Sequence, residues 1–456
     1  MYTFPTRLRF LSFVVGAAVI ATSLSLAAVA ATLCVNTSGS GGCYASIQSA
    51  VNNAAAWDVI NVGPGTYKEG VVIGIPLSLI GAGAGQSTID ATGQPNGVLV
   101  DGFNHPGLHH VVVAGFTVEN AQFEGILAVS ARKVKIRDNS VINNDQSPGL
   151  VFTGATQGCP GQPAYETDET GDCGGAIHLI GVSHSTVSGN YITGNADGLL
   201  ISDETAMSEG NLVTQNTFIN NPLECGIVLA SHPPVGHTTP PYAPHYGVVS
   251  NTVTKNVSIG NGVAIGGAGV GLFSDGNGPG RVSENVVSDN KLIHNGLGGV
   301  SLHTHVGPAF GLAADDMSNN IITGNYIASN LADTFDTATP GRVGININSG
   351  GGGSPVTGTV ITFNVIIDED VDIAINTPAR VKIHSNDLLG GNIGVANICT
   401  FDGAAICGGV IDAQWNYWGC PDGPGSGGTC SSIPAIYATG IFFTPWSPEP
   451  VANDHN

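Results

Sequence analysis

The chain has 456 residues, of which 66 are glycine and only 10% are charged, whereas an ordinary globular chain carries about 25% charged residues. Its formal charge of −21 excludes nucleic acid as a partner, because phosphate binding needs clusters of basic residues. The hydrophobic share of 42% excludes a disordered polymer. Acidic polysaccharide would also be repelled unless a cation such as Ca²⁺ bridged it, so Ca²⁺ stays open as a cofactor.

Residues 1–31 have the pattern of a secretory signal peptide. Arg7 and Arg9 precede a long apolar run, which closes on the small residues Ala28 to Ala31. Cleavage is expected at the end of this run, with an uncleaved membrane anchor as the alternative. We therefore expect a secreted protein, extracellular or periplasmic, that does not contact the membrane after cleavage.

The cysteines of an exported chain are expected to form disulfides. Eight of the nine have a close neighbour in the sequence, so we predict four short-range pairs. These pairs are Cys34 with Cys43, Cys159 with Cys173, Cys399 with Cys407, and Cys420 with Cys430. The remaining Cys225 directly precedes a strand pattern and is expected to be a buried, inert thiol.

After the leader, one short helix is expected before a long series of strands. The apolar positions recur every three or four residues from Ala45 to Ala56, which is the helical period. Short runs rich in Val and Ile follow, such as "DVINV", "GVVIGI" and "LSLIGA", and Gly or Pro separates them. From about Val111 the strand and turn pattern continues to the end of the chain.

One unit recurs along this series: an asparagine, a short β-branched run, a second asparagine and a glycine-led strand. The expected first asparagines of these units are Asn139, Asn190, Asn216, Asn251, Asn290, Asn325, Asn364 and Asn386. Repeats of roughly 20 to 50 residues indicate a solenoid or a propeller. A parallel β-helix accounts for the asparagines, because Asn tolerates the positive φ of a corner and its amide can stack on the amide of the next coil.

These units and the stretch "SIQSAVNNAAAWDVINVGPGTYKEGVVI" resemble secreted right-handed parallel β-helix proteins of the pectin-lyase-like superfamily. The resemblance covers residues 45–445. It implies an all-β, right-handed parallel β-helix (solenoid) with a short N-terminal capping helix and lateral loop insertions. We expect a single domain over 32–446 and a tail over 447–456. The superfamily holds lyases, glycosidases, esterases, epimerases and adhesins, so the resemblance does not select an activity.

Catalytic motifs of the better-known branches do not occur in the chain. The DFIFG-like strand of pectin methylesterases, the G-H-G of polygalacturonases and the D-P-H-D of mannuronan epimerases are all missing. The segment "RVKI" from Arg380 to Ile383 approaches the polygalacturonase R-I-K, but we interpret it as an ordinary strand.

Candidate catalytic residues follow from the alternation of the glycine-led strands. The first and third residues after each glycine are apolar and are predicted to point inward: Leu199, Ile201, Ile227, Leu229, Val270, Leu272, Val300, Leu302, Ile345 and Ile347. The sixth position then faces outward and reads Glu204, His232, Asp275 and His305, with His303 beside this column and Asp203 adjacent to it. In-register strands would place these groups about 5 Å apart, and a slip of one residue would scatter them.

The longest insertions leave from the same side and could wall a groove. Their aromatic residues Tyr242, Tyr246 and Phe310, and Tyr165 in the loop between Cys159 and Cys173, are candidates to stack on sugar rings. A metal held by the histidines is the alternative use of this column, but we predict no metal site. The tryptophans of "WNYWGC", Trp415 and Trp418, are expected to plug the C-terminal end of the solenoid.

Two functions of different classes remain open. The first is a polysaccharide lyase or glycosidase acting on extracellular polysaccharide. In a hydrolase Glu204 and Asp275 would be the acid and the base or nucleophile, and in a lyase His232 or His305 would abstract the proton. The second is a non-catalytic extracellular adhesin or carbohydrate-binding structural protein. In either case we expect a monomer.

Overall fold

The computed structural model describes most of the chain after the leader. The described residues are 30–144, 175–232, 246–264, 266–274, 280–304, 314–332, 339–349, 354–390, 392–398, 400–401, 404–405, 409–425 and 430–452, with the single residues Met1, Pro163 and Tyr165. Of the predicted leader, Met1 and the last two residues lie within these ranges. Nowhere in the described part does a helix have the length and apolarity to cross a bilayer.

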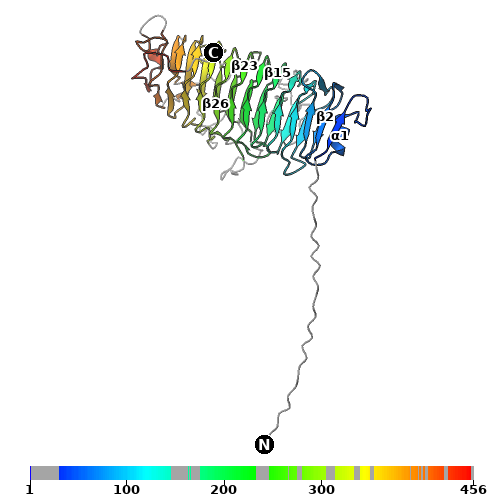
Figure 1. Ribbon diagram of the computed structural model, residues 1–456. Helices are drawn as coiled ribbons and strands as arrows, with labels where there is room; N and C mark the ends of the chain where they lie inside the picture. The colour runs from blue at the N-terminus through cyan, green and yellow to red at the C-terminus, as the bar shows by residue number, and fades with distance from the viewer. Residues whose placement is uncertain are drawn as a thin grey trace.

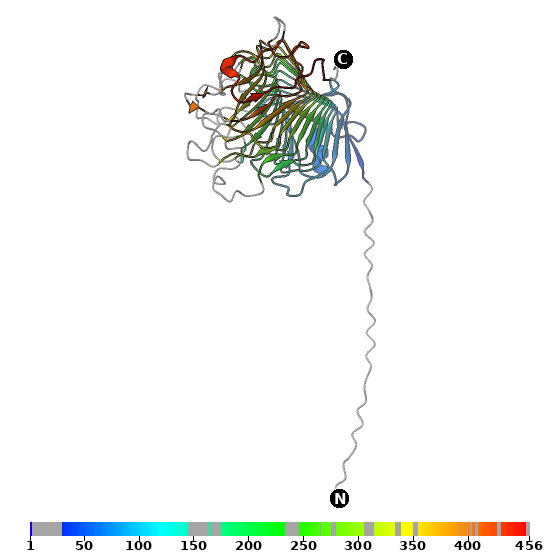
Figure 2. The same cartoon turned by 90° about the vertical axis from the view of Figure 1, so that its left-hand side faces the viewer.

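Three long parallel sheets, A, B and C, wind around one axis, and successive turns of the chain add one strand to each (Figure 1). Figure 2 looks toward the C-terminal end of this stack, where the coils lie behind one another. Neighbouring strands in these three sheets run parallel, from β1 with β2 to β40 with β41. The chain therefore folds as the right-handed parallel β-helix that the repeats predicted.

Sheet A contains β1 (Thr32–Val35), β2 (Val59–Val62), β5 (Ser78–Gly81), β8 (Val112–Ala114), β11 (Lys135–Arg137), β14 (Thr186–Ser188), β18 (Leu212–Thr214), β22 (Thr252–Thr254), β26 (Val286–Ser288), β29 (Ile321–Thr323), β32 (Val360–Thr362), β35 (Val381–His384), β40 (Ile411–Asp412) and β41 (Ile441–Phe442). Sheet B contains β3 (Gly65–Tyr67), β6 (Ser87–Asp90), β9 (Thr117–Glu119), β12 (Ser140–Ile142), β15 (Tyr191–Thr193), β19 (Thr217–Ile219), β23 (Val257–Ile259), β27 (Lys291–Ile293), β30 (Tyr326–Ala328), β33 (Val365–Ile367) and β36 (Asp387–Leu389).

Sheet C contains β4 (Val71–Ile73), β7 (Val98–Asp101), β10 (Ile126–Val129), β13 (Ile177–Ile180), β16 (Leu199–Ser202), β20 (Ile227–Ser231), β24 (Val270–Ser274), β28 (Val300–Thr304), β31 (Val343–Asn348), β34 (Val371–Asn376) and β37 (Ile393–Asn397). The smaller elements are the parallel trio β17 (Ser208–Glu209), β21 (Val248–Val249) and β25 (Val282–Ser283), the hairpin of β38 (Thr400–Phe401) and β39 (Ala404–Ala405), and the 3₁₀ turn η2 (Ala435–Tyr437).

The core is a column of aliphatic side chains inside the coil. All ten residues predicted to point inward from sheet C have no exposed surface. Facing positions of sheets A and B add residues such as Val213 and Phe218, which belong to the same cluster. Burial of these side chains from every coil stabilises the stack by about 25 cal/mol per Å² of apolar surface.

The recurring asparagines form ladders at the corners. In the corner between sheets A and B, each Oδ1 accepts hydrogen bonds from the backbone N–H and the Nδ2 of the asparagine one rung before. The ladder runs through Asn139, Asn190, Asn216, Asn256, Asn290, Asn325, Asn364, Asn386 and Asn416. The prediction was wrong at Asn251, which belongs to a separate ladder with Asn211 and Asn285. In this stretch two asparagines flank each strand of sheet A, as Asn251 and Asn256 flank β22, and the equivalent residue is the one after the strand, Asn256.

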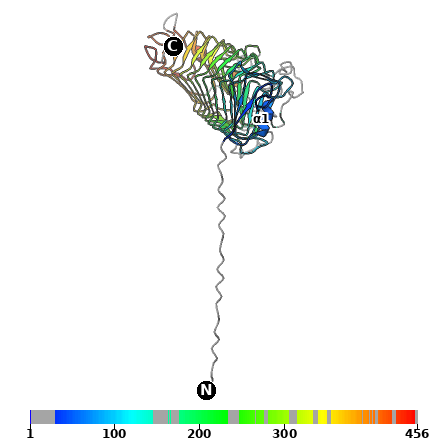
Figure 3. The same ribbon diagram turned by 45° about the vertical axis from the view of Figure 1, so that its right-hand side comes forward.

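Both ends of the coil are covered. Helix α1 (Ile47–Asn53) lies at the N-terminal end, as Figures 1 and 3 show, and it is shorter than the predicted segment. Ser46 caps it by accepting from the Ser49 N–H. At the other end Trp418 is fully buried and its ring lies 6.4 Å from that of Phe443, whereas Trp415 is 53% exposed. Only the second of the two predicted tryptophans therefore plugs the core.

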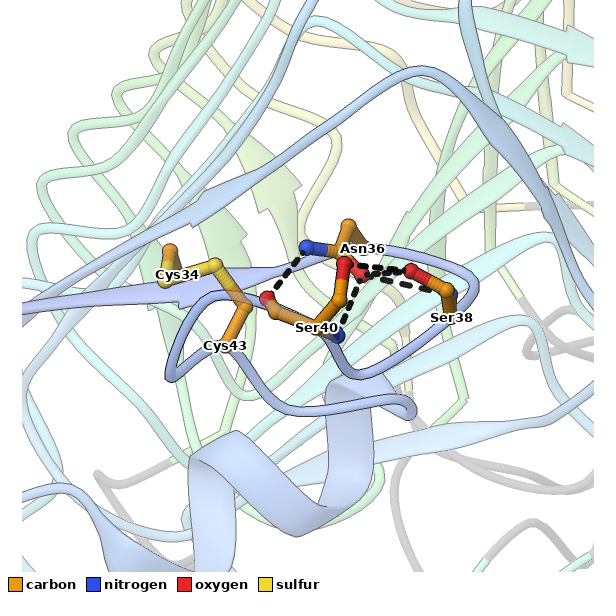
Figure 4. The surroundings of a disulfide bond; sticks show 5 residues. All are labelled: Cys34, Asn36, Ser38, Ser40 and Cys43. Carbon is orange, nitrogen blue, oxygen red and sulfur yellow. Dashed lines mark hydrogen bonds between the residues drawn. A yellow bond between two sulfur atoms is a disulfide. The ribbon is translucent and has the colours of Figure 1, made fainter.

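Two of the predicted disulfides are present near these ends. Cys34 bonds to Cys43 and Cys420 bonds to Cys430. Figure 4 shows the loop that the first one closes, where the Asn36 side chain accepts from the Ser38 and Ser40 backbone and donates to the Ser40 carbonyl. The predicted bonds of Cys159 with Cys173 and of Cys399 with Cys407 lie outside the described residues. The Cys225 thiol is buried, as predicted, and accepts from the Ala268 N–H.

Candidate functional site

A cluster of acids and histidines lies where two strands of sheet C end. Asp203 and Glu204 follow β16 directly, and His232 follows β20. These strands are paired in register, with Leu199 opposite Ile227, so their ends come together. We call Asp203, Glu204 and His232 the acidic site.

Glu204 is held by groups from both strands. Its Oε2 accepts from the Ser202 hydroxyl at 2.5 Å, and His232 Nδ1 lies 3.6 Å from its Oε1. Burial by itself would raise the pKa of Glu204, but the polar His232 ring nearby, the charges of His178 and His232 and the Ser202 hydrogen bond keep it below the usual value. Glu204 is therefore the carboxyl of the site that stays ionised.

Asp203, the residue directly before Glu204, has a different environment. Its Oδ2 accepts from the Ser231 hydroxyl at 2.8 Å and its Oδ1 from the His232 N–H at 2.6 Å. Burial, with the neighbouring Glu204 charge, raises the pKa of Asp203 to about 7. At neutral pH this carboxyl can therefore carry a proton while Glu204 does not.

Three further side chains support Glu204, and the sequence reasoning had not singled them out. His178 on β13 places Nε2 at 2.7 Å from the Ser202 hydroxyl and Nδ1 at 3.0 Å from Glu124 Oε1. Glu124 Oε2 in turn accepts from the Gly175 N–H. A weak signal exists in the sequence, since His178 is a polar residue at an outward position of a buried strand.

A chain of hydrogen bonds runs from Glu124 to Glu204. Ser202 has one hydroxyl proton, which it donates to Glu204, so His178 Nε2 acts as the donor toward Ser202. The Nδ1 atom on the other side of the His178 ring faces Glu124. The charge of His178 is one of the causes that lower the pKa of Glu204.

The acidic site is largely enclosed. Asp203 and Glu204 are 0% and 3% exposed, while the His232 side chain is 18% exposed. His232 is therefore the member of the site that reaches the surface, and a ligand would approach Glu204 past its ring.

The other candidate residues are distributed over a wider area. His303 is buried on β28 with its ring centroid 4.0 Å from that of Phe273. Tyr165 packs on Phe103, with centroids 4.7 Å apart, and Tyr246 is half-buried. The candidates Asp275, His305, Tyr242 and Phe310 lie outside the described residues.

In the described part of the chain, no three His, Cys, Asp or Glu side chains are arranged to hold a metal ion. In the acidic run from Asp368 to Asp372, Arg342 pairs with Asp368 and Asp370 at 3.6 and 3.4 Å. Asp372 accepts from the Ser431 hydroxyl. These acids are engaged in contacts within the fold.

The comparisons with known proteins concern the fold. A family model described as "Right handed beta helix region" matches residues 96–240. The search of curated proteins gives no match. Among solved structures, the Dettilon tailspike protein is similar with 14% identity and a TM-score of 0.55, covering 85% of this chain and 64% of the other.

The catalytic domain of an alpha-1,3-glucanase in complex with tetrasaccharides has 11% identity and a TM-score of 0.51, over 88% of this chain and 66% of the other. An alginate lyase from Paenibacillus sp. str. FPU-7 has 13% identity and a TM-score of 0.48, over 74% and 95%. The chain thus spans slightly less than two thirds of the tailspike and glucanase chains. These similarities support the right-handed parallel β-helix fold.

Proposed function

We propose that the protein is a secreted enzyme that acts on extracellular polysaccharide, and that it is a glycosidase with Asp203 and Glu204 as its catalytic pair. The observation that carries this proposal is the opposite direction of their pKa shifts, with Asp203 raised to about 7 and Glu204 lowered. Two carboxyl groups whose environments separate their pKa values in this way can divide the roles of acid and base.

In this mechanism the protonated Asp203 donates its proton to the glycosidic oxygen while the bond from that oxygen to the anomeric carbon breaks. The ionised Glu204 removes a proton from the attacking water or stabilises the positive charge on the sugar. Ser202 and His178 act as positioning residues, because they hold the Glu204 carboxylate through hydrogen bonds. The His232 ring must turn away from Glu204 for the sugar to enter.

A lyase is the second candidate, and the exposure of His232 favours it. A neutral imidazole at the surface could remove the proton next to a uronate carboxyl group. The products of the two reactions differ, because a lyase leaves an unsaturated end and a glycosidase leaves a saturated reducing end.

The test is the activity of the mature protein on a panel of neutral and acidic polysaccharides, with and without Ca²⁺, measured as reducing ends and as ultraviolet absorbance of unsaturated ends. Glu204→Gln and Asp203→Asn should each lower kcat by roughly 10²- to 10⁴-fold. Glu209→Gln, which removes a half-buried carboxylate on β17, should leave it unchanged. Asp203→Asn should also remove the fall in rate as the pH rises through about 7.

Three results would contradict this assignment. Full activity of both variants would show that the catalytic residues lie elsewhere on the coil. Unsaturated products lost in His232→Ala would support the lyase. Folded, inactive wild-type protein across the whole panel would favour the non-catalytic adhesin or carbohydrate-binding protein.

A further inference from the structure

Basic residues are rare in this chain, but several of them gather on one coil. Four of the thirteen Lys and Arg residues are Arg132, Lys133, Lys135 and Arg137, and all four are exposed. The corner before β11 and the first residue of β11 hold three of these cations. The sequence "ARKVKIR" shows the cluster, but only the fold shows which groups surround it.

Aromatic and imidazole groups from earlier coils join these cations. The backbone of Arg132 forms a parallel β-bridge with that of His109, which lies one rung before it. The next position in the corner is occupied by His110 in one coil and by Lys133 in the following coil. Both residues have a left-handed φ near +55°. Trp57, two rungs before His110 in the register of β2, β5 and β8, is 53% exposed. Its ring lies 5.6 Å from that of His109 and 5.3 Å from that of His110.

We call Trp57, His109, His110, Arg132, Lys133 and Lys135 the basic strip. Its positive charge is not neutralised locally. Arg137 pairs with Asp138 at 2.6 Å, but within the described chain no ion pair involves the three cations of the strip. Burial, followed by repulsion from these cations and His109, lowers the pKa of His110. The strip is thus a positive region on a protein of formal charge −21.

We propose that the basic strip binds an anionic polysaccharide chain. The three cations lie on one coil, and His109 and His110 lie on the coil before it, about 4.8 Å away. These two adjacent rungs therefore offer partners for carboxylate or sulfate groups on neighbouring sugars. The exposed indole of Trp57 provides an apolar face on which a pyranose ring can stack. A thin, flexible chain can touch this strip alone, whereas a DNA duplex or an anionic membrane would also meet the acidic surface around it.

The strip adjoins the acidic site. Ser130, two residues before Arg132, donates its hydroxyl to Thr205 Oγ1 at 2.9 Å, and Thr205 follows Glu204. A bound chain could therefore extend from the strip toward His232. The proposal does not require catalysis, because the strip contains no residue of the acidic site. The strip supplies the basic groups that an acidic polysaccharide needs, although the chain as a whole contains few of them.

The experiment measures binding by calorimetry, using the Glu204→Gln protein so that no substrate is consumed. The probes are a galacturonic acid oligomer, the same oligomer fully methyl-esterified, a heparin oligomer and a single-stranded oligodeoxynucleotide. The strip variant is Arg132→Gln, Lys133→Asn and Lys135→Gln. The matched control is Lys255→Asn, Lys291→Gln and Lys382→Gln, which removes three exposed cations elsewhere. Lys255 has the same left-handed backbone as Lys133, so both variants place Asn at a left-handed corner.

The expected result is binding of the carboxylated or the sulfated oligomer that weakens by roughly tenfold in the strip variant and not in the control. This affinity should fall as salt rises from about 50 to about 200 mM. Trp57→Ala should weaken binding with little change in salt dependence. The galacturonate and heparin arms show which acidic group is preferred. Equal binding of the esterified oligomer, equal loss in the control, equally tight binding of the oligonucleotide, or binding of neither acidic oligomer would overturn the proposal.

Discussion

At the scale of single residues, the acidic site shows how position changes the chemistry of one functional group. Asp203 and Glu204 are neighbours in sequence and both are buried. Asp203 accepts from a serine and a backbone N–H, and its pKa rises to about 7 because desolvation dominates. Glu204 lies beside two histidines, and its pKa falls. Desolvation is the largest single effect at both carboxyl groups, but at Glu204 the two histidines and Ser202 together outweigh it.

The raised pKa of Asp203 predicts a pH-dependent stability. The carboxyl ionises near pH 4 when unfolded and near pH 7 when folded, so its contribution is fully present below about pH 4 and is lost as the pH rises through 7. The wild-type protein should lose unfolding free energy between pH 5 and 8, and Asp203→Asn should lose roughly 2 kcal/mol less over the same range. Chemical denaturation at a series of pH values measures this. The exposed Asp138→Asn is the control, and parallel profiles for wild type and Asp203→Asn would contradict the assignment.

At the scale of elements, the corners are stabilised by amide ladders. Asn256 is 1% exposed. Its Oδ1 accepts from the backbone and the side chain of Asn216, and its Nδ2 donates to Asn290 Oδ1 and the Val213 carbonyl. Each amide thus satisfies backbone groups of neighbouring coils that the bend leaves without strand partners.

Removing one member should therefore destabilise the coil. Asn256→Ala leaves buried donors and acceptors without partners, so we expect a loss of about 3 kcal/mol of unfolding free energy. Lys255→Ala, at the exposed position next to it, should cost much less unfolding free energy. The left-handed φ at this position is already present with Lys, so its strain is not new in the variant. Denaturant titration of both variants is the measurement. Similar losses would mean that the ladder adds little to stability.

A third ladder, which runs through Asn261, Asn295 and Asn330, ends on an acid, which adds a pH effect. Glu369 Oε1 takes the place of an asparagine oxygen and accepts from the backbone N–H and Nδ2 of Asn330, both at 2.9 Å. Burial raises the pKa of Glu369 to about 7, so its stabilisation is complete below pH 4.5 and declines as the pH passes 7. Glu369→Gln keeps the acceptor and cannot ionise. Its unfolding free energy should exceed that of wild type by roughly 1 to 2 kcal/mol at pH 8 and not at pH 5.

At the scale of the whole molecule, coils contact mainly the coils next to them, as in other solenoids. The ends are the exposed part of such a stack, and here α1, Trp418 and the two described disulfides lie near them. The stability of a terminal coil can therefore be changed without altering the middle of the stack.

Replacing Cys34 and Cys43 by Ser tests this local character. The bond closes a short loop with a sequence separation of 9, so its loss should destabilise the N-terminal coil by about 2 to 3 kcal/mol. Hydrogen exchange should become faster in β1, β2 and α1 and stay unchanged in β22 to β28. Faster exchange spread evenly along the chain would instead mean that the coils unfold as one cooperative unit.

The sequence by itself determined the coil, because its signals are local. Alternation selects the inward residues such as Ile227 and Leu229, and asparagines beside β-branched runs select corners. Tertiary structure decided what depends on distant neighbours. It showed that Asn256, and not Asn251, belongs to the ladder of Asn216 and Asn290. It also brought Glu124 to His178 and Trp57 to the basic strip. The pKa of Asp203 also belongs to this second group, since desolvation is set by every residue packed around a carboxyl and leaves no trace in the local pattern.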